Sequence, residues 1–158
     1  MTSERLSSTR AIEATAEALF AVLADPSEHA TIDGTGWVRD PIDGQELTRE
    51  GQIFRMAMYH DNHPEKSYEV ANKVVLFDPP NAIAWKPGQA ADDTDELQFG
   101  GWVWRYDLTP GNASTTTVML SYDWSGVPAE LRQFIQFPPF GQDHLDQSLQ
   151  HLAEIVRP

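Results

Sequence analysis

The chain has 158 residues, and its 24 acidic and 11 basic residues give a formal net charge of −13. This excess of negative charge repels phosphate groups, so it disfavours nucleic acid and anionic membrane surfaces as partners. Cysteine is absent, which excludes disulfides, thiolate metal sites and a cysteine nucleophile. The sequence contains neither an apolar run of the roughly 20 residues that a spanning helix needs nor the layout of a secretory signal. We therefore expect a cytoplasmic protein.

The N-terminal part of the sequence predicts a strand followed by two short helices. Residues 5–14 alternate loosely and predict the opening strand. Thr15 is placed to cap a helix whose apolar stripe consists of Ala16, Leu19, Phe20 and Leu23. Pro26 ends that helix, because a proline disfavours helical geometry at the residue before it. Pro26 also suits the first position of a second short helix that runs to about Ile32.

The central part of the sequence, from Trp37 to Trp124, alternates with a period of two and predicts a meander of strands. Short turns between consecutive strands imply antiparallel pairing. We expect Pro87-Gly88 to end one of these strands early, and the acidic stretch 89–96 to form an exposed loop. The expected strands span residues 37–39, 52–60, 68–77, 82–86, 102–108 and 115–124.

The C-terminal part predicts the one long helix of the chain. Leu145, Leu149, Leu152 and Val156 form a single apolar stripe. An earlier stripe begins at Leu131 and is interrupted by Pro138-Pro139, since neither proline has an amide hydrogen to donate. We expect a short helix, a break over residues 137–141 and a long helix to the end.

These elements predict an α+β fold: a curved antiparallel sheet of about seven strands wrapped around a long C-terminal helix. Two short helices lie between the first and second strands. No repeat, low-complexity tract or linker divides the sequence, so we expect one domain over residues 1–158.

Several segments of the sequence together carry a resemblance to a known superfamily. They are the opening strand and helix, Asp25–His29, Asp33–Gly36, Gly51–Met56, Tyr68–Val74, Phe77–Pro80, Ile83–Trp85, Trp104–Leu108 and Tyr122–Trp124. In these segments the sequence resembles the START-like (SRPBCC) superfamily, whose members include birch-pollen-allergen relatives and bacterial polyketide cyclase/dehydrase-like proteins. The resemblance implies a helix-grip fold with a cavity between the sheet and the long helix, which usually holds a hydrophobic or amphipathic small molecule. The chain departs from the pattern at Pro138-Pro139.

The inward faces of the expected strands carry the candidate ligand-binding residues. Large apolar and aromatic side chains there form either a packed core or the wall of a pocket. We expect Phe134 and Phe137, beside the paired prolines, to face the mouth of the pocket in a segment more mobile than the rest of the helix. The ligand-binding candidates are Phe54, Met56, Met58, Asn72, Trp85, Trp102, Trp104, Tyr106, Tyr122, Phe134 and Phe137.

Histidines are the candidates for acid–base or metal chemistry. His60 ends an inward face and is the candidate catalytic base, with a solvated strand end as the alternative interpretation. His60 and His63 lack a third ligand, so we predict no metal site, and no motif indicates a cofactor. We interpret His144 and His151 as part of a solvated side of the last helix.

Three functions are compatible with these features. The first is binding of a hydrophobic or aromatic small molecule (lipid-, steroid- or polyketide-like) between the sheet and the C-terminal helix. The alternative is a polyketide cyclase, aromatase or dehydratase that uses His60 or a tyrosine in the same cavity. The third is a protein-interaction module of the Hsp90-activator type, which would require a contiguous apolar surface patch. The sequence identifies neither the ligand nor the oligomeric state.

Overall fold

The structure is a computed structural model that describes residues 4–33, 38–42, 45–59, 67–90, 97–111, 114–133, 137 and 141–156. Its first half contains β1 (Arg5–Ile12), α1 (Ala16–Leu23), the single-turn 3-10 helix η1 (Pro26–Glu28), α2 (His29–Ile32), β2 (Val38–Pro41) and β3 (Ile53–Tyr59). Its second half contains β4 (Ser67–Asp78), β5 (Ala82–Ala90), β6 (Leu97–Phe99), β7 (Val103–Pro110), β8 (Thr116–Asp123), α3 (Ala129–Arg132) and α4 (Gln142–Ile155).

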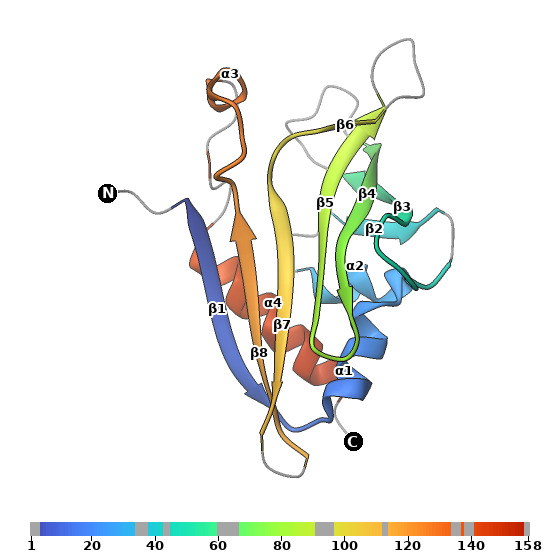
Figure 1. The fold of residues 1–158 in the computed structure, drawn as a ribbon, viewed down its shortest axis with the longest axis vertical. Coiled ribbons are helices and arrows are strands. Elements are labelled where there is room, and N and C mark those ends of the chain that lie inside the picture. Colours follow the sequence, from blue (N-terminus) through green and yellow to red (C-terminus); the bar gives the residue numbers. More distant parts are fainter. Residues whose placement is uncertain are drawn as a thin grey trace.

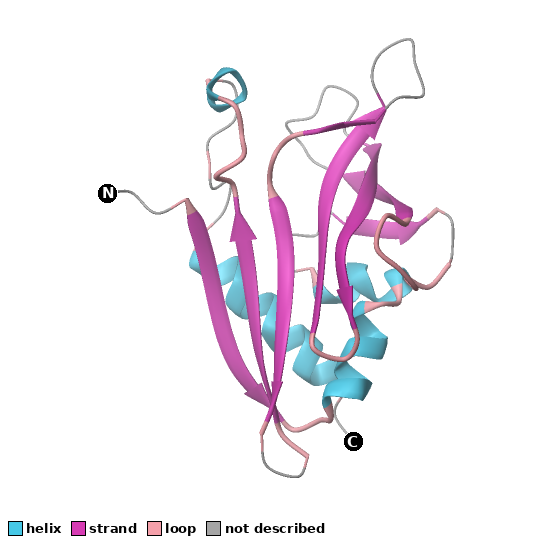
Figure 2. Cartoon of the chain, in the orientation of Figure 1, coloured by secondary structure: helices cyan, strands magenta, loops and turns pink. Residues whose placement is uncertain are grey.

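The strands form one antiparallel sheet in the order β1-β8-β7-β5-β4-β3-β2, and the short strand β6 pairs with β5 beside this path. The sheet curls around α4, which crosses it obliquely, and α1 and α2 cover the same face (Figures 1 and 2). The α+β helix-grip prediction is therefore confirmed, with seven strands on the main path.

The N-terminal helices follow their sequence signals. The Thr15 side chain accepts a hydrogen bond from the Ala18 amide at 3.1 Å and caps α1 as predicted. Asp25 caps η1 in the same way by accepting from the Ser27 amide at 3.0 Å. The apolar stripe of α1, which ends at Leu23, is buried against the sheet.

A β-bulge in β4 changes which side chains face inward. The register with β5 shifts between Val74 and Leu76, so one extra residue lies on β4 at this point. Up to Val74 the even-numbered residues face inward, as predicted. Beyond the bulge Leu76 lies opposite the outward Ala84, and Phe77 turns inward to contact Phe20 of α1 with ring centroids 5.3 Å apart. Leu76 therefore does not share the inward side of β4 with Asn72 and Val74.

The strand predicted to end before Pro87 continues as β5 to Ala90. Pro87 lies opposite Asn72 of β4, but β7 pairs with β5 only as far as Trp85, and β6 pairs with it only from Gly88. One side of Pro87 therefore has no ladder partner among the described strands. A proline is tolerated there because its missing amide hydrogen leaves no bond unmade.

The long helix buries its predicted stripe. Leu145, Leu149 and Leu152 are almost fully buried against the sheet and α1, and each such side chain contributes about 1.5–3 kcal/mol through removal of apolar area from water. The hydroxyl of Ser8 on β1 donates to the Asp146 carboxylate and ties the start of α4 to the edge of the sheet.

The helix α3 lies at the far end of β8 (Figure 1). Its last residue, Arg132, donates to the carbonyls of Trp124 at 2.8 Å and Val127 at 3.1 Å. The same guanidinium forms an ion pair with Glu4 at 2.9 Å. One side chain thus joins α3, the end of β8 and the residue before β1.

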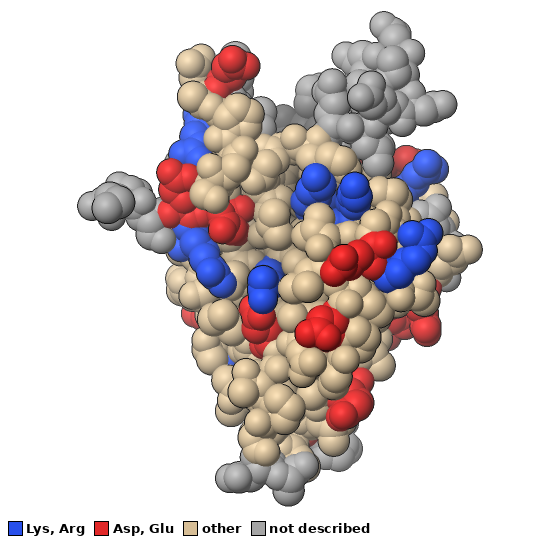
Figure 3. Space-filling view, in the orientation of Figure 1, with Lys and Arg blue, Asp and Glu red and all other residues tan. Residues whose placement is uncertain are grey.

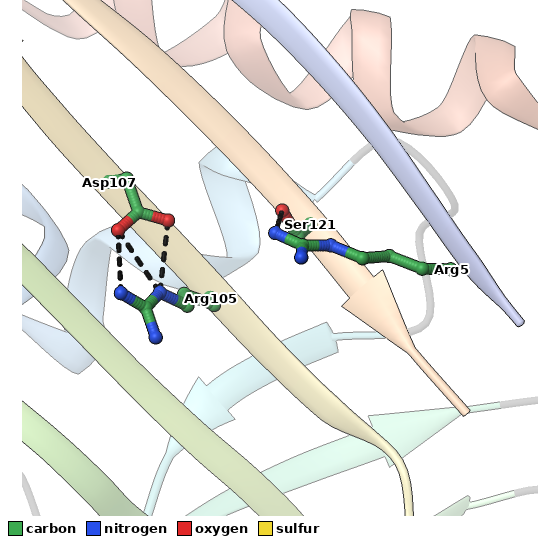
Figure 4. Close-up of polar contacts among 4 residues, drawn as sticks. All are labelled: Arg5, Arg105, Asp107 and Ser121. Carbon is green, nitrogen blue, oxygen red and sulfur yellow. Dashed lines mark hydrogen bonds and ion pairs between the residues drawn. The ribbon is translucent and has the colours of Figure 1, made fainter. Parts of the chain in front are cut away.

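The outer face of the sheet is polar, and basic and acidic groups are interspersed on it (Figure 3). Arg105 and Asp107 form a two-pronged ion pair there, and Arg5 donates to the Ser121 hydroxyl at 2.7 Å (Figure 4). Within the described ranges, no helix is long and apolar enough to cross a membrane.

Candidate functional site on the inward aromatic face

Three aromatic residues form a row across the inward face of the sheet. Trp85 of β5 lies directly opposite Trp104 of β7, which lies opposite Tyr122 of β8. The rings of Trp104 and Tyr122 have centroids 4.6 Å apart. Although both tryptophans point toward the helices, they remain partly exposed. We call Trp85, Trp104 and Tyr122 the aromatic row.

Two further aromatic residues extend this surface beyond the aromatic row. Tyr106 is the diagonal neighbour of Trp85, with centroids 6.0 Å apart, and Phe54 meets the same indole edge-to-face at 5.7 Å. Asn72 of β4 lies opposite Phe54 in the ladder, so its amide is inserted into the same surface. The inward side chains of five strands thus form one continuous aromatic area with a single amide in it.

His29, the first residue of α2, covers part of this area. Its imidazole stacks on Trp85 with centroids 5.0 Å apart and an interplanar angle of 15°. Because the Leu23 carbonyl can only accept, Nε2 of His29 carries the proton that bridges them at 2.8 Å, and Nδ1 of the neutral ring is an acceptor. Burial lowers the pKa of His29 below 6.5, against smaller opposing effects of Leu23 and Asp25. The ring is therefore neutral at neutral pH.

Asp33 and His144 approach each other beside the aromatic row. Asp33 follows α2 and His144 lies in the first turn of α4, and each side chain is only 9% exposed. Asp33 Oδ1 lies 3.8 Å from His144 Nε2, and Asp33 Oδ2 accepts from the Val38 amide at 3.2 Å. The His144 ring packs edge-to-face with the Trp104 ring, and their centroids are 5.8 Å apart.

The pKa of His144 is lowered, mainly by burial and also by His151, while the Asp33 charge opposes the shift. His144 is therefore a neutral imidazole beside a carboxylate. His151, two turns later on α4, donates from Nδ1 to the Ile32 carbonyl at 3.1 Å. This bond holds α4 against α2 at the residue that precedes Asp33.

Tyr106 and Asn72 are buried polar residues, at 4% and 5% exposure. Neither the Tyr106 hydroxyl nor the Asn72 amide forms a hydrogen bond to any residue in the described part of the chain. Burial, and secondarily the nearby Asp33 charge, raises the pKa of Tyr106 far above 10, so the phenol keeps its proton. Both are polar groups within the aromatic area, where water or a bound molecule can be their partner.

The remaining predicted residues occupy different places. Phe54 and Met56 belong to the closed core, and Met58 is partly buried at its margin. Trp102 and Phe137 contact each other with ring centroids 5.7 Å apart, in a cluster with Tyr122, Trp124 and Val127 at the Tyr122 end of the aromatic row. His60 and Phe134, together with the paired prolines at 138 and 139 and the predicted mobility of their segment, fall outside the described residues.

Sequence reasoning missed His29, Asp33, His144 and His151. The interpretation of the last two as part of a solvated helix side was wrong, because the His144 side chain is buried and His151 contacts α2. The available signal was that each immediately precedes a buried leucine of the apolar stripe, Leu145 and Leu152. Among the described side chains, no three of His, Cys, Asp or Glu come together as metal ligands.

Comparisons with known proteins identify the fold. No protein-family model matches the chain, and no curated protein matches it. Solved structures do match: a Nitrosomonas europaea protein has 15% identity and a TM-score of 0.69 over 99% of this chain and 97% of that chain. A truncated norcoclaurine synthase from Thalictrum flavum has 14% identity and a TM-score of 0.64 over 99% and 97% of the two chains. A major latex-like protein of Panax ginseng has 12% identity and a TM-score of 0.65 over 98% and 97%. At these identities the likeness shows a shared helix-grip fold.

Proposed function

We propose that this protein binds a hydrophobic, aromatic small molecule between the inward face of the sheet and α4, with the aromatic row as the main contact surface. Flat ring systems suit this surface, because tryptophan and tyrosine offer broad apolar faces with a polar group at one end.

The observation that carries the proposal is that Trp85 and Trp104 face inward and yet remain partly exposed. In a closed core, side chains of this size would be covered completely, as Phe54 and Met56 are. A large apolar side chain that is inward but accessible borders space that another molecule can occupy. One solved structure with this fold is named a norcoclaurine synthase, so the fold is compatible with a small-molecule function.

The buried polar groups fit this proposal. A ligand with polar substituents would supply partners for the Tyr106 hydroxyl and the Asn72 amide, which have none among the described residues. We therefore expect an amphipathic aromatic ligand, since a pure hydrocarbon would displace water from both groups without replacing its hydrogen bonds.

Binding of the neutral dye Nile red, followed by its fluorescence and by quenching of the tryptophans, tests the proposal. We expect saturable binding that Trp104→Leu weakens by about tenfold or more, because the indole face is the main contact. Val75→Ala on the outer face is the control and should bind as wild type, since Val75 is 38% exposed.

Circular dichroism of both variants establishes that they are folded before affinities are compared. Equal dye affinity of folded wild type and folded Trp104→Leu would place binding elsewhere and contradict the proposal. The proposal would also be contradicted if the wild type showed no saturable binding of the dye or of any lipid, steroid or polyketide in a panel.

A further inference from the structure

We propose that Asp33 and His144 form a polar subsite that holds a hydroxyl group of the aromatic ligand. This inference rests on the proposed function, because it assigns the polar end of the same binding site. It identifies the ligand class as neutral hydroxylated aromatic molecules, in contrast to carboxylates and to ethers.

The first argument is the separation of the two groups. Asp33 Oδ1 and His144 Nε2 are 3.8 Å apart, which exceeds the length of a direct hydrogen bond. A single oxygen atom placed beside both can lie within about 2.8 Å of each, which is an ordinary hydrogen-bond length. Both residues have further contacts within the protein, and the pair is spaced to share one group in addition to them.

The second argument is the chemistry of the two groups. An ionised carboxylate only accepts hydrogen bonds, and the Nε2–H tautomer of a neutral imidazole donates from the nitrogen that faces Asp33. A hydroxyl can donate to Asp33 and accept from His144 at the same time. An ether oxygen can only accept, and a ligand carboxylate would be repelled by the charge of Asp33.

The third argument is burial beside the aromatic row. The side chains of Asp33 and His144 are each 9% exposed. The His144 ring packs edge-to-face with Trp104, with ring centroids 5.8 Å apart. In a site this poorly hydrated, a hydrogen bond to a charged group discriminates strongly between ligands that make it and ligands that do not.

The fourth argument is rigidity. Asp33 is held by the Val38 amide at 3.2 Å, and His151 fixes the preceding carbonyl, that of Ile32, at 3.1 Å. The subsite thus joins α2, α4 and β2 through backbone contacts, so its two groups are positioned before a ligand arrives.

The test compares 2-naphthol, 2-methoxynaphthalene and 2-naphthoate, three molecules with one ring system and different polar groups, as competitors of Nile red. We expect wild type to bind 2-naphthol at least about tenfold more tightly than 2-methoxynaphthalene. We expect it to bind 2-naphthoate most weakly. In Asp33→Asn, the preference for the naphthol should fall below about threefold and the affinity for 2-naphthoate should rise, because the repelling charge is gone.

His144→Gln is the second variant and should reduce the naphthol preference without improving binding of the naphthoate. Asp107→Asn is the matched control, since it removes a carboxylate from the outer face and should leave all three affinities at wild-type values. A rise in naphthoate affinity specific to Asp33→Asn is a readout that loss of structure alone would not produce.

The outcomes separate the two proposals. If wild type binds all three naphthalenes equally, the subsite is overturned while the proposed binding function stands. If the naphthol preference persists in folded Asp33→Asn and folded His144→Gln, the subsite is likewise overturned. If wild type binds neither Nile red nor any naphthalene, the binding function fails and the subsite fails with it.

Discussion

The two ends of the space between the sheet and the helices differ sharply. At the closed end, Leu108 and Val118 of the sheet are buried beneath α1 and the later turns of α4. At the other end, the aromatic row is partly exposed, and Asn72, Tyr106 and the Asp33–His144 pair lie around it.

The same strands build both ends, so the difference comes from what covers them. Aliphatic leucines of α1 and α4 close one end, whereas α2 and the first turn of α4 bring histidines and a carboxylate to the other. We therefore expect stability to be concentrated at one end and ligand recognition at the other, and the following experiments test that division.

The largest effect is expected at the closed end. Leu152→Ala removes a fully buried side chain of α4 and should lower the free energy of unfolding by about 3 kcal/mol, through lost burial and the cavity that remains. Urea unfolding followed by tryptophan fluorescence measures this. Val75→Ala on the outer face is the control and should change stability by less than about 0.5 kcal/mol. A loss below about 1 kcal/mol for Leu152→Ala would show that this end is not closed.

Removing one hydroxyl from each end sharpens the comparison. The buried Thr116 hydroxyl donates to the Ala14 carbonyl at 2.8 Å, so Thr116→Val should cost about 2 kcal/mol by leaving that acceptor unpaired. Tyr106→Phe removes a hydroxyl without a partner among the described residues and should leave stability unchanged or raise it by up to about 1 kcal/mol. Chemical denaturation of both variants checks this, and equal losses would refute the distinction.

The buried histidines predict acid sensitivity that arises at the site. Burial lowers the pKa of His29 and His144 below 6.5 in the folded chain. The unfolded chain then binds more protons below about pH 6.5, so stability is constant above that pH and falls as the pH is lowered through it.

Each such histidine contributes a slope of up to about 1.4 kcal/mol per pH unit. His29→Gln retains a donor for the Leu23 carbonyl and should flatten the profile measured by urea unfolding between pH 7 and pH 5. An unchanged slope in this variant would mean that other groups cause the acid sensitivity.

The smallest effect is expected on the outer face. Arg105→Ala breaks the exposed ion pair with Asp107 (Figure 4) and should change stability by about 0.5 kcal/mol, because solvent screens such pairs. The loss should shrink further in high salt, and Nile red affinity should not change. A large salt-independent loss would show that the outer face contributes more to stability than its exposure indicates.

The sequence was sufficient to predict the fold, because its signals are local: the Thr15 cap, the leucine stripe of α4 and the alternation of β7 and β8. It also identified Trp85, Trp104, Tyr106 and Asn72 as inward residues. Their role in binding stays a prediction.

It did not identify Asp33 and His144, because the two are 111 positions apart and their approach depends on how α2 and α4 meet above the sheet. No local pattern encodes that meeting. The prediction that the strand ends before Pro87 was wrong for a similar reason, because the effect of this proline depends on which neighbouring strands reach that point of β5.

The extra residue in β4 has a consequence for how this chain tolerates change in length. Side chains along a strand alternate between the two faces of the sheet, and the bulge between Val74 and Leu76 shifts this alternation by one residue. Loss of one residue at this point would restore regular pairing while Leu76 stays outward and Phe77 stays inward, in contact with Phe20. It would also remove a bend that curves the sheet around its helices. The middle of β4 is therefore a position where the chain can lose one residue without exchanging the inward and outward side chains of the strand.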